Sequence, residues 1–105
     1  MTDETRIDEL IADLRQAPLA VRRAATAELG ASGAAAVEPL IAAMLDGDND
    51  LRWYAARALV QIGAPAIAPL LAAMRAREDR DFRRYAMAAL TGIGEAAVEP
   101  LIGVI

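Results

Sequence analysis

The chain repeats itself at intervals of 30 and then 31 residues, and this repeat constrains the fold more than any other feature. When residues 21–44 are placed over residues 51–74, eleven of 24 positions are identical. Residues 51–74 placed over residues 82–105 share ten positions. Alanine is frequent throughout, but alanine bias does not explain the matched glycine, proline, arginine and leucine residues. An internal period of this length is typical of stacked supersecondary units.

Each repeat is predicted to hold two helices. In the middle repeat, apolar residues from Leu51 to Ile62 recur at i, i+4, i+7, i+8 and i+11, which is the spacing of one buried helix face. Gly63 then follows, and glycine commonly ends a helix. Gly33 and Gly94 hold the same position in the neighbouring repeats, so we predict that the first helix of each repeat ends there.

The second helix of each repeat carries a proline in its first turn, at Pro39, Pro69 and Pro100. Proline is tolerated there because its missing N–H belongs to a turn whose donors are unpaired in any case. The linkers 46–50 and 78–81 are rich in acidic residues. We predict that their carboxylates cap the helices that follow.

The chain is predicted to form one domain over residues 1–105. The repeat register extends back to residues 7–20, which form a second helix whose first helix is missing. Full repeats follow at 21–50 and 51–81, and the last, at 82–105, is truncated. The predicted fold class is therefore all-α, an α-α superhelix of about seven antiparallel helices.

The pattern Leu51-Arg-x-x-Ala-Ala-x-Ala-Leu-x-x-Ile-Gly, followed by Ala66-x-x-Pro-Leu-Leu, resembles the HEAT-like repeats named after the phycobilisome lyases. The resemblance covers nearly the whole chain. It implies stacked antiparallel helix pairs in a right-handed superhelix, with the second helices lining the concave side. It does not imply one activity, because this module serves as a scaffold in many settings.

Composition excludes most catalytic chemistry. The chain has no histidine and no cysteine, which excludes histidine bases, thiol nucleophiles, disulfides and the usual nitrogen and sulfur metal ligands. HEAT-like deoxyhypusine hydroxylases depend on His-Glu metal motifs that this sequence lacks. Residues 46–50 resemble the start of an EF-hand, but Leu51 and Arg57 stand where that loop needs glycine and glutamate. We therefore predict a capping turn, no cofactor, no metal site and no enzymatic activity.

Arg22, Arg52 and Arg83 hold the same position in successive repeats. They are consistent with an exposed stripe that binds anions, or with a structural ladder in which each arginine pairs with an acid of a neighbouring turn, such as Asp50 or Asp81. The repeat pattern of the family favours the ladder.

The next two positions of each first helix flank the buried stripe, and we expect them to be partly exposed. Tryptophan and arginine are enriched at the energetic centres of protein interfaces, and the only tryptophan of the chain lies here. In the alternative interpretation, guanidinium groups stack on the tryptophan within the molecule and the tyrosines fill the groove between repeats. The predicted partner-binding residues are Arg23, Trp53, Tyr54, Arg57, Arg84 and Tyr85.

The last six residues of the sequence lack the polar cap that usually covers the end of a solenoid. Either the array continues in a longer chain or another chain covers this end. A homodimer is the simplest closed arrangement. The predicted oligomer contacts are Leu101, Ile102, Val104 and Ile105.

The net charge of −4 and the absence of lysine argue against nucleic-acid binding, although HEAT-like alkylpurine glycosylases bind it. The sequence contains no uninterrupted apolar run of about 18 residues, so no membrane-spanning helix is predicted. The acidic start does not resemble a signal peptide, which predicts a cytoplasmic location without a membrane partner.

The predicted function is a non-catalytic protein–protein interaction scaffold with another protein as its partner. The resemblance also implies an alternative, a bilin or tetrapyrrole lyase-like subunit or chaperone, in which Arg57 holds propionates and Trp53 stacks on a ring.

Overall fold

The structure is a computed structural model that describes the backbone of residues 3–16 and 18–104 and the side chains of residues 5–15 and 18–95. Its α-helices are α1 (Asp3–Gln16), α2 (Leu19–Ala31), α3 (Val37–Asp46), α4 (Asn49–Ile62), α5 (Ile67–Ala76) and α6 (Arg80–Val104). Short 3-10 turns, Gly33–Ala36 and Ala64–Ala66, lead into α3 and α5. The described part of the chain contains no strand, so the predicted all-α repeat fold is confirmed.

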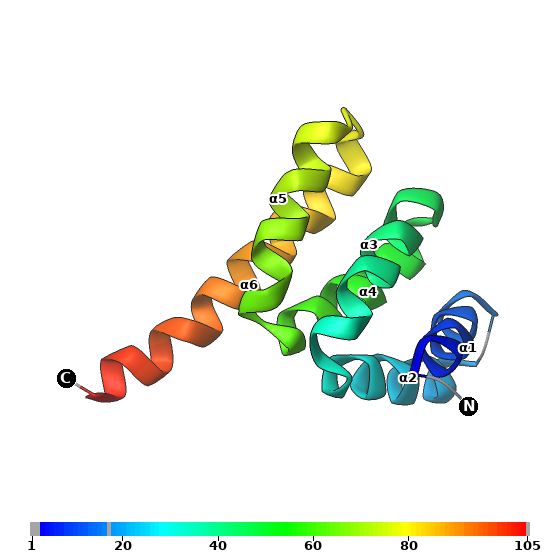
Figure 1. Cartoon of the computed structure of the whole chain (residues 1–105), viewed down its shortest axis with the longest axis horizontal. Coiled ribbons are helices and arrows are strands. Elements are labelled where there is room, and N and C mark those ends of the chain that lie inside the picture. Colours follow the sequence, from blue (N-terminus) through cyan, green and yellow to red (C-terminus); the bar gives the residue numbers. More distant parts are fainter. Residues whose placement is uncertain (1–2, 17, 105) are drawn as a thin grey trace.

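The helices form two layers (Figure 1). In one layer α4 packs between α2 and α6, and in the other α3 packs between α1 and α5. Between the layers, the closest packing joins α1 to α2, α3 to α4 and α5 to α6. None of the described helices, α6 included, is long and apolar enough to cross a membrane.

The core lies between the two layers. Leu29, Leu40, Leu59 and Leu70 come from matching repeat positions of successive helices, and all four are completely buried. Burying one such side chain contributes about 1.5–3 kcal/mol. The repeat thus places a fully buried leucine at a matching position of each of these four helices, and small buried alanines allow the helices to approach closely.

Acidic residues cap α4 and α6, as the linker composition predicted. The Asp48 carboxylate accepts a hydrogen bond from the backbone N–H of Leu51 at 2.9 Å. The Asp79 carboxylate accepts one from the N–H of Phe82 at 3.1 Å. Both caps satisfy a donor that the first turn of α4 or α6 leaves without a helical partner.

The prediction that Gly94 ends a helix is wrong. Gly33 and Gly63 have φ of +72° and +83° and separate the first helix of their repeat from the second. Gly94 holds the same repeat position, but α6 continues through it, so the described chain has six α-helices and not seven. Ser32 precedes the first break and Pro65 follows the second, and both residue types favour leaving a helix. Neither type flanks Gly94, and the alanines after it favour helix.

Candidate interaction surface

The column of arginines at one repeat position is structural. Arg52 is buried, and its Nε donates a hydrogen bond to the carbonyl oxygen of Met44 at 2.9 Å. Its Nη1 donates to the side-chain oxygen of Asn49 at 3.0 Å. The Met44 carbonyl lies in the last turn of α3, so the cation meets the negative end of a helix dipole.

The other two arginines of this column reach back in the same way. Arg83 donates to the Met74 carbonyl at 3.3 Å, and Arg22 donates to the Arg15 carbonyl at 3.5 Å. The column therefore has a structural role, but the predicted pairing of each arginine with an acid is wrong, because all three side chains bind helix C-terminal carbonyls.

Where the ladder does include an acid, it differs from the predicted one. The carboxylate nearest to Arg52 belongs to Asp79, at 3.9 Å, whereas Asp50 and Asp81 were the predicted examples. Asp79 is favoured because it already faces this turn as the cap of α6.

Trp53 lies on α4, in the layer that α4 forms with α2 and α6, and is 49% exposed. Its ring meets the ring of Tyr54 edge to face, with centroids 5.0 Å apart. The guanidinium carbon of Arg57 lies 4.9 Å from the Trp53 centroid. The predicted stacking within the molecule is therefore present, and it fixes the ring while half of it stays accessible.

Both tyrosines were expected to be partly exposed, and one of them is not. Tyr85 is half-buried, as expected, but Tyr54 is buried. Tyr54 packs between the Trp53 ring and the guanidinium of Arg22, whose carbon lies 5.8 Å from its centroid. Tyr54 therefore supports Trp53 from below the surface.

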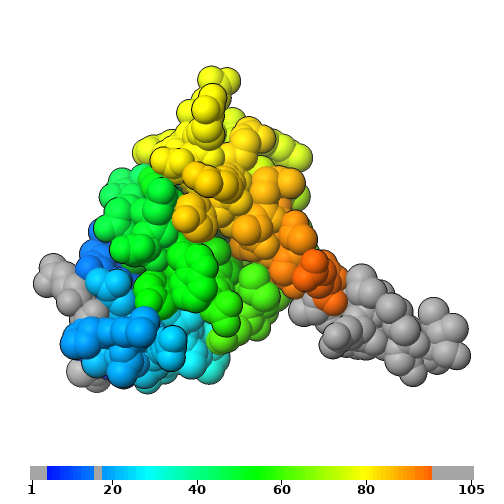
Figure 2. Space-filling model, turned by 180° about the vertical axis from the view of Figure 1, so that it is seen from behind, coloured from blue at the N-terminus to red at the C-terminus, as the bar shows by residue number. Residues whose placement is uncertain are grey.

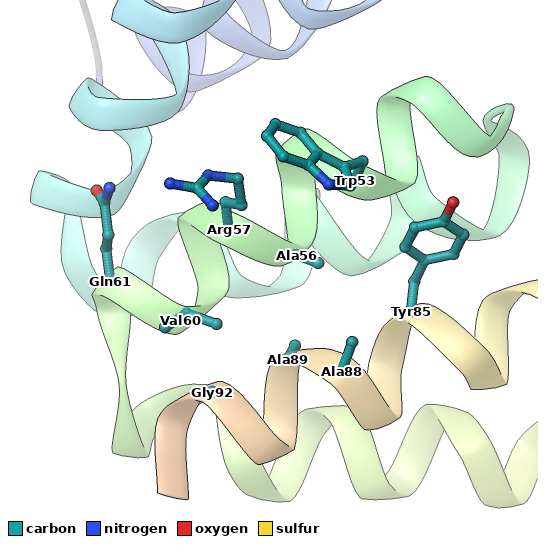
Figure 3. Close-up of a pocket in the computed structure, with 9 residues that line it drawn as sticks. All are labelled: Trp53, Ala56, Arg57, Val60, Gln61, Tyr85, Ala88, Ala89 and Gly92. Carbon is teal, nitrogen blue, oxygen red and sulfur yellow. The ribbon is translucent and has the colours of Figure 1, made fainter. Parts of the chain in front are cut away.

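A groove of about 370 Å³ runs between α4 and α6 on this face (Figure 3). Trp53, Arg57 and Tyr85 rise along it, and small residues form its floor. A Cβ atom added at Gly92 would lie 2.8 Å from the nearest methyl carbon of Val60, so glycine permits this close approach of α6 to α4. The remaining lining residues are Ala56, Gln61, Ala88 and Ala89.

A second hollow, of about 380 Å³, lies on the other side of Trp53, between α2 and α4. Arg23 lines it, and Trp53 and Arg57 line both hollows. Trp53 thus forms a ridge between two depressions. Figure 2 shows the face on which they lie, with α4 in green between α2 in blue to cyan and α6 in yellow to orange.

Arg84, another predicted contact, lines neither hollow. Its side chain is exposed, lies 3.6 Å from a carboxylate oxygen of Asp81 and approaches the ring of Tyr85. The structure therefore gathers five of the six predicted partner-binding residues and leaves Arg84 beside them. The predicted oligomer contacts Leu101, Ile102, Val104 and Ile105 lie outside the side chains that the structure describes.

Sequence reasoning missed the floor of the groove. Ala88 and Gly92 are four residues apart on α6, and small residues at that spacing allow two helices to approach closely. That spacing is the signal in the sequence that could have indicated a shallow groove beside the tryptophan.

The two layers differ in charge. Helices α2 and α4 together carry four arginines and two acidic residues, whereas α1 and α3 carry two arginines and seven acidic residues. The face that holds Trp53 is therefore the more positive one. Among the residues whose side chains are described, no three carboxylates are placed to hold a metal ion together.

Comparisons with known proteins are consistent with the repeat. Residues 7–91 match the model of the family described as HEAT repeats. The "Uncharacterized phycocyanin operon protein Z" of Pseudanabaena tenuis (strain PCC 7409) is 46% identical over 61 residues. That match covers 57% of this chain and 30% of the relative, so the similarity spans less than a third of the relative's length. No solved structure matches the chain.

Proposed function

Because the chain belongs to the HEAT-repeat family, we propose that it is a non-catalytic scaffold that binds another protein through the surface around Trp53. The observation behind this proposal is a half-exposed tryptophan on a ridge between two hollows. We define the Trp53 surface as Arg23, Trp53, Arg57 and Tyr85. Proteins built from stacked repeats commonly use such extended surfaces for binding.

The ring of Trp53 is suited to act as an anchor. A large aromatic side chain contributes most to binding when it is already held in its bound rotamer, because little entropy is then lost. Contacts with Tyr54 and Arg57 hold the ring in this way. The cation–π contact with Arg57 adds about 0.5–1 kcal/mol at an exposed site.

The chemistry of the surface indicates the kind of segment that it accepts. The apolar floor of the α4–α6 groove suits an apolar side chain of a partner. Arg23 and Arg57 at the rim of the second hollow suit a carboxylate on the same partner. The proposed partner segment is therefore apolar with acidic flanks.

The test compares Trp53→Ala with Leu19→Ala. Leu19 is a matched control because it is exposed to a similar extent, on α2, and lines neither hollow. A partner identified by capture on the wild-type chain is purified, and its Kd is measured by calorimetry. We expect Trp53→Ala to raise Kd at least about tenfold, or about 1.4 kcal/mol, while Leu19→Ala leaves it unchanged.

Two results contradict the proposal. Equal Kd values for the wild type and Trp53→Ala place the binding surface elsewhere. A loss of several kcal/mol in the free energy of unfolding of Trp53→Ala makes the ring part of the core, since exposed substitutions rarely have such effects.

A second candidate function is a bilin or tetrapyrrole lyase-like subunit or chaperone. The supporting observation is the similarity to a phycocyanin operon protein. A flat ring system would stack on Trp53 in the α4–α6 groove, with its propionates at Arg57. Titration with a free bilin tests this candidate, because the single tryptophan reports on the groove by fluorescence. Unchanged bilin absorbance and unchanged Trp53 emission exclude it.

A further inference from the structure

The second hollow, between α2 and α4, continues into a third. The third hollow measures about 390 Å³ and adjoins the second, because Trp53 and Tyr54 line both. Arg22 of α2 and Asp50 of α4 complete its lining. Together the two hollows form the α2–α4 trough. The floor of the α4–α6 groove is apolar, whereas charged side chains make up much of the lining of the trough.

The trough carries an excess of positive charge. Arg23 and Arg57 line its first part and Arg22 its second, whereas Asp50 is the one acidic side chain among the lining residues. Among the residues whose side chains the structure describes, no carboxylate forms an ion pair with any of these three arginines. The described part of the chain therefore leaves this charge without a counter-ion of its own.

The acidic residue of α2 is directed elsewhere. Glu28 is the only acid on this helix and does not line the trough. Its carboxylate accepts hydrogen bonds from the Arg6 guanidinium at 2.6 and 3.0 Å, which joins it to α1. The pair therefore holds the carboxylate of Glu28 toward the other layer and away from the three arginines.

The arginines of the trough keep hydrogen-bond donors free for a ligand. The Nε atom of Arg22 is buried and has no hydrogen-bond partner in the described part of the chain. The bond from this guanidinium to the Arg15 carbonyl is long, at 3.5 Å. In Figure 3 the Arg57 side chain points away from Ala88 of α6, which is the direction of the trough. Guanidinium groups bind carboxylates through paired N–H donors, so these side chains suit an acidic ligand.

We propose that the α2–α4 trough is a carboxylate site, in which an acidic side chain of the partner protein binds between Arg23 and Arg57, with Arg22 as the third cation. This inference rests on the proposed function, because it assigns the chemistry of a ligand at the same surface. A long polyanion fits less well than a short acidic segment. The chain carries a net charge of −4, and α1 and α3 in the other layer are acidic, so a nucleic acid is repelled outside the trough.

Asp50 weakens the site. Its carboxylate lines the trough beside Arg22 and repels an incoming anion. Asp50 is not the cap of α4, since the carboxylate of Asp48 accepts the hydrogen bond from the N–H of Leu51. Asp50 can therefore be replaced while the cap is kept, which separates its charge from its place in the helix.

Peptide titration tests the site without the partner. The probe is an acetylated and amidated triglutamate peptide, the control is the matching triglutamine peptide, and inorganic phosphate is the third titrant, all at one ionic strength. Emission of Trp53 reports binding, because this single tryptophan lines the trough. We expect a saturable change with triglutamate and none with triglutamine. Phosphate lacks an apolar stem to pack beside the ring and is expected to bind more weakly.

Charge variants show whether the peptide binds in the trough. We expect Arg23→Gln to raise the Kd of triglutamate about three- to fivefold and Asp50→Asn to lower it about twofold, as for exposed charge pairs. Arg75→Gln removes the same charge from an exposed position of α5, in the other layer, and is expected to leave the Kd unchanged. All three positions are exposed, so the variants are expected to keep the fold. Arg57 is not replaced because it also holds the Trp53 ring.

Four results overturn the proposal: no saturable change with triglutamate, equal effects of Arg23→Gln and Arg75→Gln, an unchanged Kd in Asp50→Asn, or tighter binding of phosphate than of triglutamate. The two proposals also fail in different ways. If Trp53→Ala weakens partner binding and Arg23→Gln does not, the carboxylate site is wrong and the Trp53 surface stands. If Trp53→Ala leaves partner binding unchanged, the proposed function is wrong, and the peptide titration still decides whether the trough binds a carboxylate.

Discussion

Replacing Arg52 by methionine tests whether the arginine ladder stabilises the stack of helices. Methionine keeps an unbranched apolar stem of similar reach and removes the guanidinium group. Three contacts are lost: those with the Met44 carbonyl at 2.9 Å, with Asn49 at 3.0 Å and with Asp79 at 3.9 Å. These contacts join the end of α3, the start of α4 and the linker before α6, so the variant loosens three turns at once.

The expected loss follows from the individual contacts. A hydrogen bond from a charged group contributes about 1.5–3 kcal/mol, and a buried carbonyl left unpaired costs about 1–3 kcal/mol. The more exposed Asp79 pair adds about 0–1 kcal/mol. Burial of the guanidinium has its own desolvation cost, which methionine avoids. We therefore expect the free energy of unfolding of Arg52→Met to fall by about 2 kcal/mol, or the Tm by roughly 8–16 °C.

Urea unfolding followed by circular dichroism at the helix band measures this difference. Arg83→Met is the matched control because it changes the same repeat position, but Arg83 is exposed and its carbonyl bond is longer, at 3.3 Å. For this control we expect a loss below about 1 kcal/mol. Equal losses in Arg52→Met and Arg83→Met would refute the dependence on burial, and no loss in Arg52→Met would refute the ladder as a source of stability.

Three further predictions concern the cap of α4, the turn after α4 and an ion pair on the surface. Asp48→Ala should lose about 1 kcal/mol of stability in urea unfolding, whereas Asp48→Asn keeps a capping oxygen and should lose much less. Gly63→Ala should lose roughly 1–2 kcal/mol because φ is +83° there, and Gly94→Ala, inside α6, should lose nothing. The Arg6 guanidinium donates hydrogen bonds to Glu28 at 2.6 and 3.0 Å and holds the pKa of that carboxyl below its usual value. The stability that this pair contributes is present above the unfolded-state pKa of Glu28 and is lost as the pH falls through the folded-state pKa. The free energy of unfolding of Glu28→Gln should therefore fall less steeply in acid than that of the wild type.

Each of these three predictions has a result that contradicts it. Equal stability of Asp48→Ala and Asp48→Asn means that the cap contributes nothing. Equal stability of Gly63→Ala and Gly94→Ala means that the turn does not need a residue that readily adopts a positive φ. Identical acid unfolding curves for the wild type and Glu28→Gln mean that the pair with Arg6 does not act on folding.

Much of the fold could be predicted because one signal was repeated along the chain. The same glycine, proline and leucine positions recur at intervals of 30 and 31 residues, so each repeat is an independent statement of the same structure. The acidic caps were predictable for a similar reason, since Asp48 and Asp79 lie in equivalent linkers and each caps a helix.

The outcome at Gly94 was not predictable from the repeat alone. Glycine permits a helix to end but does not force it to. The break after α4 also has Pro65, and the break after α2 has Ser32, whose hydroxyl hydrogen-bonds the Glu28 carbonyl. Local context therefore decided between a turn and a continuous helix where the repeat pattern had indicated a turn.

The burial of side chains at the edge of the buried face of α4 was also difficult to predict. Trp53, Tyr54 and Arg57 lie within one turn and a half of α4, and periodicity places all three near the edge of the buried stripe. Which of them becomes buried depends on the neighbouring helix. Arg22 on α2 lies close to Tyr54 and covers it, while Trp53 remains on the surface beside Arg57.

Positions that recur and positions that vary have different roles in this chain. The column of Arg22, Arg52 and Arg83 is invariant, and all three side chains bind helix-end carbonyls. The adjacent column contains Arg23, Trp53 and Arg84, and this is where the half-exposed ring stands. A residue that every repeat needs for stacking is maintained in all of them, whereas a residue that serves a partner is needed only where the partner binds. Positions that depart from the repeat are therefore the most informative ones for function, which is why Trp53 is the first residue to replace in a binding experiment.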